Sequence, residues 1–134
     1  MIEGIKDFMT SKIISIDEGE KVTEAVKKMV EHNIGSVVVK RDNEFVGIVT
    51  ERDILERCYK ENIYSPDLIV KKIMSSPLIT IEADAPIGKA VKLMEGKDIR
   101  RLLVEEDGKI VGIITQKDIL RETLYILMTL QSRD

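Results

Sequence analysis

Hydrophobic and polar positions follow the same order of patterns twice along the chain. Short runs rich in isoleucine, KIISI at 12–16 and PLITI at 77–81, are typical of strands. The stretch 17–33 then places apolar residues at the i, i+3, i+4, i+7, i+8 spacing of an amphipathic helix. Further continuous apolar runs predict pairs of strands, and a helix is expected after each pair, at TERDILERCYK and TQKDILRETLYILMTL.

The two sets of patterns are a duplication. VGIVTERDIL occupies residues 46–55 and VGIITQKDIL residues 111–120, with seven of ten letters identical and an offset of 111 − 46 = 65 residues. The offset holds without a gap from Ile5, which meets Val70, to Arg57, which meets Glu122. Such a long constant register indicates a duplicated ancestral unit of about sixty residues.

Each copy reads β-α-β-β-α, so the fold class is α/β (α+β). Asp107-Gly108 predicts a tight hairpin between the last two strands of the second copy, and Asp42-Asn43 a weaker one in the first. We expect the first copy over residues 5–60, the second over 70–122 and a C-terminal helix over 123–134. Two such copies, packed with pseudo-two-fold symmetry, would bury a shared core and leave equivalent clefts.

A Thr-x-x-Asp string stands at the end of the third predicted strand of each copy, as Thr50 to Asp53 and Thr115 to Asp118. One reading is a helix cap, in which the threonine hydroxyl accepts from the backbone N–H three residues on and the acid reaches back. The other reading is a ligand site, because a helix N-terminus suits anions and a carboxylate can accept both vicinal hydroxyls of a ribose.

Gly47 and Gly112 precede these strings by three residues. A glycine has no side chain, so a ligand could approach the strand closely there. The full string G-h-h-T-x-x-D, present twice at the same place in the repeat, favours the ligand reading.

Composition narrows the functional class. The chain has 134 residues, 43% hydrophobic and 34% charged, with a net charge of −3 that argues against nucleic-acid binding. One cysteine, Cys58, excludes an internal disulfide and fits a reducing compartment. No apolar run reaches the roughly 20 residues of a membrane span, so we expect a cytoplasmic protein. The high content of charged residues and the low content of Asn and Gln favour a thermophilic source.

The repeated strings FMTSKIISI with IGSVVVKRDNEFVGIVTERDIL, and KIMSSPLITI with IRRLLVEEDGKIVGIITQKDIL, resemble a tandem pair of cystathionine-β-synthase (CBS) domains, or Bateman module. The resemblance covers about residues 5–122. It implies a regulatory module, usually dimeric, with clefts that bind AMP, ADP, ATP or S-adenosylmethionine. In that family the Asp typically holds the ribose hydroxyls and the Thr contacts ribose or phosphate.

The resemblance also assigns residues to two unequal clefts. The first would combine the first predicted strand and the Thr-x-x-Asp string of the first copy with basic residues of the second copy. Its residues would be Lys12, Ile13, Ile14, Gly47, Thr50, Asp53, Arg100 and Arg101. The second would have no base on its phosphate side and would combine Ser76, Pro77, Leu78, Gly112, Thr115 and Asp118 with Ser36. Without the resemblance, the two arginines could equally be a solvated strand entrance that pairs with nearby acids.

No catalytic or metal-binding residue is predicted. A single His and a single Cys make neither a zinc site nor a Cys–His nucleophile convincing. We therefore expect a non-catalytic sensor of an adenosine ligand that needs no cofactor and acts on a separate target protein. The alternative is a structural interaction module whose clefts bind no nucleotide.

The C-terminal stretch ETLYILMTLQ is more apolar than its counterpart ERCYKENIY in the first copy. A surface helix on a small monomer normally keeps one polar face, so this stretch predicts a homodimer contact. The helix could instead fold back over the core of its own chain.

Overall fold

The computed structural model describes residues 4–60 and 65–131, and the chain divides into two compact units. We call them after the aspartates of the two Thr-x-x-Asp strings. The Asp53 unit spans Ile13–Leu78, and the Asp118 unit combines Met1–Lys12 with Ile79–Asp134. Each unit therefore contains most of one repeat together with the segment that begins the other repeat. We call these segments the lead-in segments, residues 5–12 of the first repeat and 70–78 of the second.

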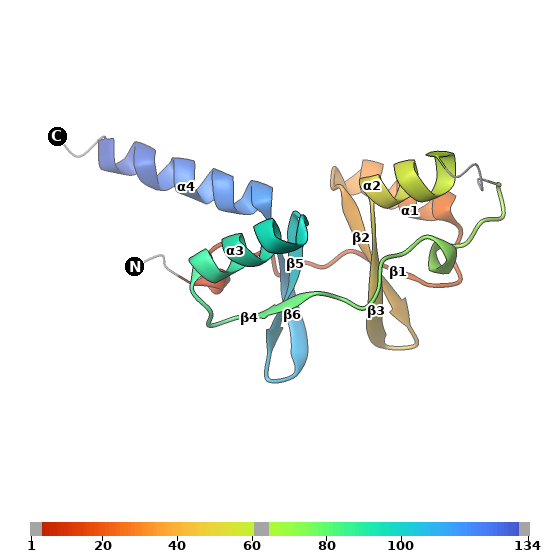
Figure 1. The fold of residues 1–134 in the computed structure, drawn as a ribbon, viewed down its shortest axis with the longest axis horizontal. Helices are drawn as coiled ribbons and strands as arrows, with labels where there is room; N and C mark the ends of the chain where they lie inside the picture. Colours follow the sequence, from red (N-terminus) through yellow and green to blue (C-terminus); the bar gives the residue numbers. More distant parts are fainter. Residues whose placement is uncertain (1–3, 61–64, 132–134) are drawn as a thin grey trace. The chain divides into compact units, whose positions relative to one another are not determined.

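The elements follow the predicted β-α-β-β-α order in both repeats (Figure 1). The Asp53 unit contains β1 (Ser15–Asp17), α1 (Val22–His32), β2 (Ser36–Arg41), β3 (Glu44–Thr50), α2 (Glu51–Asp53), the π-helical η2 (Ile54–Lys60) and the 3₁₀ turn η3 (Val70–Lys72). The Asp118 unit contains the 3₁₀ turn η1 (Ile5–Asp7), β4 (Thr80–Glu82), α3 (Ile87–Lys97), β5 (Arg101–Glu106), β6 (Lys109–Thr115) and α4 (Gln116–Gln131). The predicted mixed α/β fold class is confirmed.

Each unit has a three-stranded sheet, in the order β1-β2-β3 or β4-β5-β6. The short first strand runs parallel to the middle strand, because α1 or α3 provides the crossover, and the hairpin strands are antiparallel. The hairpins turn at residues with positive φ, Asp42 (55°) in one unit and Asp107 (52°) with Gly108 (78°) in the other. Both predicted hairpins are thus present.

Two apolar cores coincide with the two units. The middle strands are buried over consecutive residues, with Val37–Val39 and Leu102–Val104 at most 2% exposed. Ile5 and Phe8 of the first repeat pack in the core of the Asp118 unit. Val70 and Ile73 of the second repeat pack in the core of the Asp53 unit. The repeats therefore exchange their lead-in segments, and each core needs apolar residues from both.

The exchanged segments cross the hairpins at two glycines. A Cβ at Gly47 would lie 2.7 Å from Met74 Sδ and 2.9 Å from the carbonyl oxygen of Ser75. A Cβ at Gly112 would meet Met9 Sδ and the Thr10 oxygen at the same two distances. The expectation that these glycines leave room for a ligand is wrong, because methionine and backbone atoms occupy the space.

Part of the predicted apolar stripe of α1 faces outward. Val22, Ala25 and Met29 are buried, whereas Val26 and Val30 are 38% and 76% exposed. Among the described helices, the structure contains none that is long and apolar enough to cross a membrane.

Gly47→Ala should destabilise the protein by about 1–3 kcal/mol, because a backbone carbonyl cannot withdraw from the added methyl group without moving the crossing segment. Denaturant unfolding measures the change. Gly88→Ala is the matched control, since Gly88 lies in α3 with nothing within 4 Å of an added Cβ. That variant should be neutral or stabilised by up to about 1 kcal/mol. Equal destabilisation of both variants would contradict the close crossing.

Candidate functional site

The Thr50–Asp53 turn is a reciprocal helix cap. The backbone N–H of Asp53 donates to Thr50 Oγ1 at 3.1 Å, and the backbone N–H of Thr50 donates to Asp53 Oδ2 at 2.9 Å. The local sequence explains the geometry, because threonine at the N-cap and an acid three residues later satisfy two otherwise unpaired donors. The capping reading is confirmed for this turn, and it places the Asp53 carboxylate at the end of β3.

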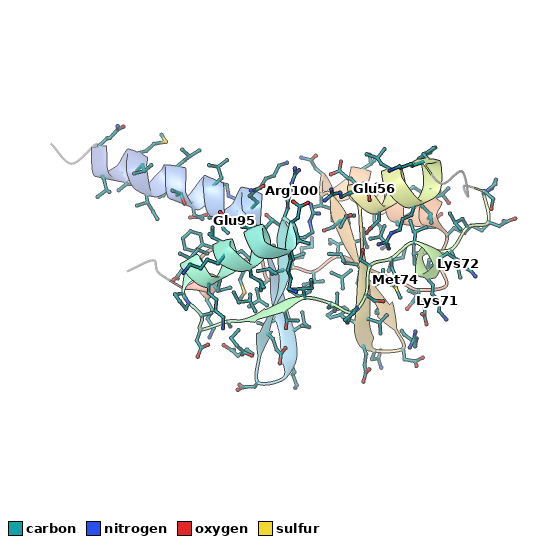
Figure 2. The ribbon with its side chains drawn as sticks, viewed as in Figure 1. Glu56, Lys71, Lys72, Met74, Glu95 and Arg100 are labelled. Carbon is teal, nitrogen blue, oxygen red and sulfur yellow. The ribbon has the colours of Figure 1, made fainter. Side chains whose placement is uncertain are left out.

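Two further side chains engage Asp53 in the same unit. Ser75 Oγ donates to Asp53 Oδ1 at 3.0 Å, and Arg57 Nε lies 3.8 Å from the same oxygen. Arg57 also donates from Nη1 to the carbonyl oxygens of Ile73 (3.1 Å) and Met74 (2.9 Å). Figure 2 shows Met74 on the segment that follows η3. The exchanged segment is thus fastened to the turn through both Ser75 and Arg57.

Asp53 keeps acceptor capacity despite these contacts. An ionised carboxylate offers about four acceptor positions, two on each oxygen. The Thr50 N–H takes one position on Oδ2, and the Ser75 hydroxyl takes one on Oδ1. One position therefore remains on each oxygen, which is the number that a vicinal diol requires. With Asp53 only 7% exposed, such a diol would be largely desolvated on binding.

The Thr115–Asp118 turn has the same cap but a different partner. Asp118 N–H donates to Thr115 Oγ1 at 3.1 Å, and Thr115 N–H donates to Asp118 Oδ2 at 2.9 Å. Here Arg121 Nη2 donates to Asp118 Oδ1 at 2.9 Å, and the Arg121 side chain is 65% exposed. The second carboxylate is therefore paired with a cation of its own helix.

The lead-in segments pair with the turns differently from the prediction. Ser75 bridges Ile48 in β3, with backbone hydrogen bonds of 2.8 and 3.0 Å, whereas Thr10 bridges Ile113 in β6 with two bonds of 2.9 Å. Ser76, Pro77 and Leu78 consequently belong to the Asp53 unit, although they were assigned to the second turn. The reason is the close crossing at Gly47, which admits the Met74–Ser75 segment.

The other predicted lead-in residues are divided between the units. Ile13 and Ile14 lie in the Asp53 unit, as the first cleft requires, and the Ile14 oxygen accepts the Val38 N–H at 3.0 Å. Lys12 is exposed and lies in the Asp118 unit.

The predicted phosphate-side residues stand beside the turn of their own repeat. Ser36 is opposite Thr50 in the β2–β3 register and is 8% exposed. Arg101 is opposite Thr115 in the β5–β6 register, and the exposed Arg100 precedes β5 (Figure 2). The cross-repeat assignments, of the arginines to Asp53 and of Ser36 to Asp118, remain predictions.

Sequence reasoning missed Ser75, Arg57 and Arg121 as partners of the aspartates. At the offset of 65 residues, Arg57 meets Glu122 and Glu56 meets Arg121. This reversal of charge at two successive positions was the available signal that the two turns differ.

The single cysteine has no reactive environment. Cys58 is fully buried in the core of the Asp53 unit, and burial, followed by the charge of Asp53, raises the pKa of its thiol. A buried thiol with a raised pKa is a poor nucleophile. Within residues 4–60 and 65–131, no group of three or more His, Cys, Asp or Glu side chains is arranged to hold a metal ion.

Comparison with known proteins identifies the family. The CBS domain model matches residues 5–60 and 70–125. An uncharacterised protein of Methanopyrus kandleri is 40% identical over 121 residues, which cover 89% of this chain and 62% of that protein. A crystal structure of an uncharacterised conserved protein from Pyrococcus horikoshii has 36% identity and a TM-score of 0.83, with 90% of this chain and 91% of that chain covered.

A hexameric CBS-CP12 protein from bloom-forming cyanobacteria is also similar, with 26% identity, a TM-score of 0.81, and 94% of this chain and 73% of that chain covered. The chain therefore belongs to the CBS-domain family, and its two CBS repeats form a regulatory module.

Proposed function

We propose that this module is a non-catalytic sensor that binds an adenosine ligand, such as AMP, ADP, ATP or S-adenosylmethionine, and regulates a separate target protein. The observation that carries the proposal is the Asp53 carboxylate. It is buried, it is held in a fixed orientation by Thr50 and Ser75, and it keeps one acceptor position on each oxygen. These features suit the two vicinal hydroxyls of a ribose.

A phosphate group on the ligand would need a cation, and Arg100 and Arg101 are the proposed contacts. Arginine presents several N–H donors in a plane that matches the oxygens of a phosphate. The proposal assigns the phosphate contact to these arginines because the family resemblance implies it.

A structural interaction module is the second candidate function, and exposed apolar side chains on the helices favour it. At the offset of 65 residues, Val26, Leu55 and Tyr59 of the Asp53 unit correspond to Val91, Leu120 and Leu124 of the Asp118 unit. All six are between 36% and 64% exposed. Exposed apolar side chains at matching positions of both repeats favour a protein contact surface. This surface is compatible with a sensor, so ligand binding decides between the two functions.

The deciding experiment is thermal unfolding of the chain with AMP, ATP or S-adenosylmethionine. A ligand that binds only the native state stabilises it by about 2.7 kcal/mol at a free concentration of 100 times Kd, so the unfolding midpoint should rise. Guanosine nucleotides serve as the comparison for base selectivity. Unchanged midpoints with all three adenosine compounds would leave the interaction module as the function.

Asp53→Ala should weaken AMP binding about tenfold or more, because charge-assisted hydrogen bonds are worth about 1.5–3 kcal/mol. Isothermal titration calorimetry measures the affinity. Asp53→Asn is the matched control for the helix cap, because the amide oxygen of asparagine can still accept from the Thr50 N–H. It should retain the unfolding midpoint and still lose much of the affinity. Wild-type affinity in Asp53→Ala would show that the ribose does not bind this carboxylate.

The two turns should bind ligands unequally. The Asp53 turn should prefer ligands with phosphates, and its affinity should fall as salt screens the arginine contacts. The Asp118 turn should be empty or hold a less charged adenosine compound, since Ser36, the residue predicted on its phosphate side, carries no positive charge. Calorimetry from about 50 to 500 mM salt and a crystal structure with AMP test this. Two AMP molecules with matching phosphate contacts would contradict it.

We also propose a homodimer formed through α4. The structure does not have this helix folded back over the core, because Leu124, Leu127 and Met128 are 50%, 53% and 67% exposed. With Leu120, which is 58% exposed, these side chains form one apolar strip at i, i+4, i+7 and i+8. Two copies of such a strip around a two-fold axis would cover each other.

Leu124→Lys combined with Leu127→Lys should convert the dimer to a monomer, because charged side chains oppose burial of the strip. Multi-angle light scattering measures the mass of the full chain and of this variant. The control is Thr129→Lys, which adds one positive charge on the opposite side of α4 and should leave a dimer. A monomeric wild type, or a double variant that remains dimeric, would remove α4 from the interface.

A further inference from the structure

We propose that Arg57 and Ser75 couple nucleotide binding at Asp53 to the docking of the segment Ile73–Ser75. This inference rests on the proposed function and adds a regulatory connection within the same site. Both residues act as positioning residues, since each contacts Asp53 and neither is needed to hold the ligand directly.

Within the Asp53 unit, Ser75 and Arg57 each contact both the Asp53 carboxylate and the backbone of a neighbouring segment. Ser75 Oγ donates to Asp53 Oδ1 at 3.0 Å, while the Ser75 backbone pairs with Ile48 in β3. Arg57 donates to the carbonyl oxygens of Ile73 and Met74 at 3.1 and 2.9 Å, and its Nε lies 3.8 Å from Asp53 Oδ1. The carboxylate and the segment are therefore held by the same two side chains.

The other repeat lacks this arrangement. The position equivalent to Arg57 is Glu122, which cannot donate to a carbonyl oxygen. Asp118 is paired with Arg121 of its own helix, a contact that involves no residue of the exchanged segment. The coupling is thus a property of the Asp53 turn and follows from the reversed charges at this pair of positions.

The sign of the coupling follows from the acceptor positions. Ser75 uses one position on Oδ1, and a ribose hydroxyl would take the other, so the ligand and Ser75 favour the same orientation of the carboxylate. Binding a nucleotide should therefore strengthen docking of Ile73–Ser75, and the docked segment should raise nucleotide affinity by the same factor. The segment continues through Leu78 into Ile79 of the Asp118 unit, so the chain connects the site covalently to the other unit.

AMP titration by calorimetry of the full chain tests the proposal. Ser75→Ala removes the hydrogen bond to the carboxylate, and Arg57→Gln removes the ion pair with it, so each should weaken AMP about three- to tenfold. Ser75→Thr keeps the hydroxyl, as Thr10 does at the equivalent position, and should restore affinity to within about twofold of wild type. Lys60→Gln removes one positive charge from the same helical segment without touching Asp53 and is the control for net charge.

Hydrogen exchange of the Ser75 amide is the second measurement, because a purely structural role would not make it depend on ligand. In wild type, AMP should slow exchange of this amide, which donates to the Ile48 oxygen at 2.8 Å. In Arg57→Gln the effect of AMP should be reduced.

Two results would overturn the coupling while leaving nucleotide binding intact. One is wild-type AMP affinity in both Ser75→Ala and Arg57→Gln. The other is faster exchange of the Ser75 amide with AMP, which would mean that the ligand displaces the serine. If the wild-type chain binds none of AMP, ATP and S-adenosylmethionine, the proposed function fails and the coupling fails with it.

Discussion

The structure depends on the close approach of two chain segments to two glycines. At Gly47 and Gly112, methionine sulfur and backbone oxygen lie where a side chain would otherwise begin. This contact lets the lead-in of each repeat cross the hairpin of the other and add its apolar residues to that core. Because one lead-in is exchanged at each crossing, neither compact unit corresponds to one sequence repeat.

The crossing also builds the candidate site. It brings Ser75 to the carboxylate of Asp53, which the local cap with Thr50 has already placed at the end of β3. Arg57 then secures the crossing segment by its backbone oxygens. The carboxylate that closes the helix cap is therefore also the group that we propose binds the ribose, and the cap fixes its orientation.

The local features could be predicted from sequence because they depend on neighbouring residues. The element order, both hairpins and the capping geometry follow from apolar spacing, turn residues and the Thr-x-x-Asp strings. The exchange could not be predicted, because the two lead-ins have similar sequences, FMTSKIISI and KIMSSPLITI, and each satisfies either hairpin by pattern alone. The role of glycine was misread for the same reason, since the atoms that fill the space belong to the other repeat, to Met74 and Ser75 at Gly47 and to Met9 and Thr10 at Gly112.

Amide hydrogen exchange in a variant with one weakened core tests most directly whether each lead-in segment packs in the core of the other repeat. Val39→Ala opens a cavity in the core of the Asp53 unit, where Val39 is fully buried. The account predicts faster exchange of the Ser75 amide together with the amides of β2 and β3, while the Thr10 amide, bonded to Ile113, changes less. Faster exchange at Thr10 with an unchanged Ser75 would show that each lead-in belongs to its own repeat, and would contradict the account.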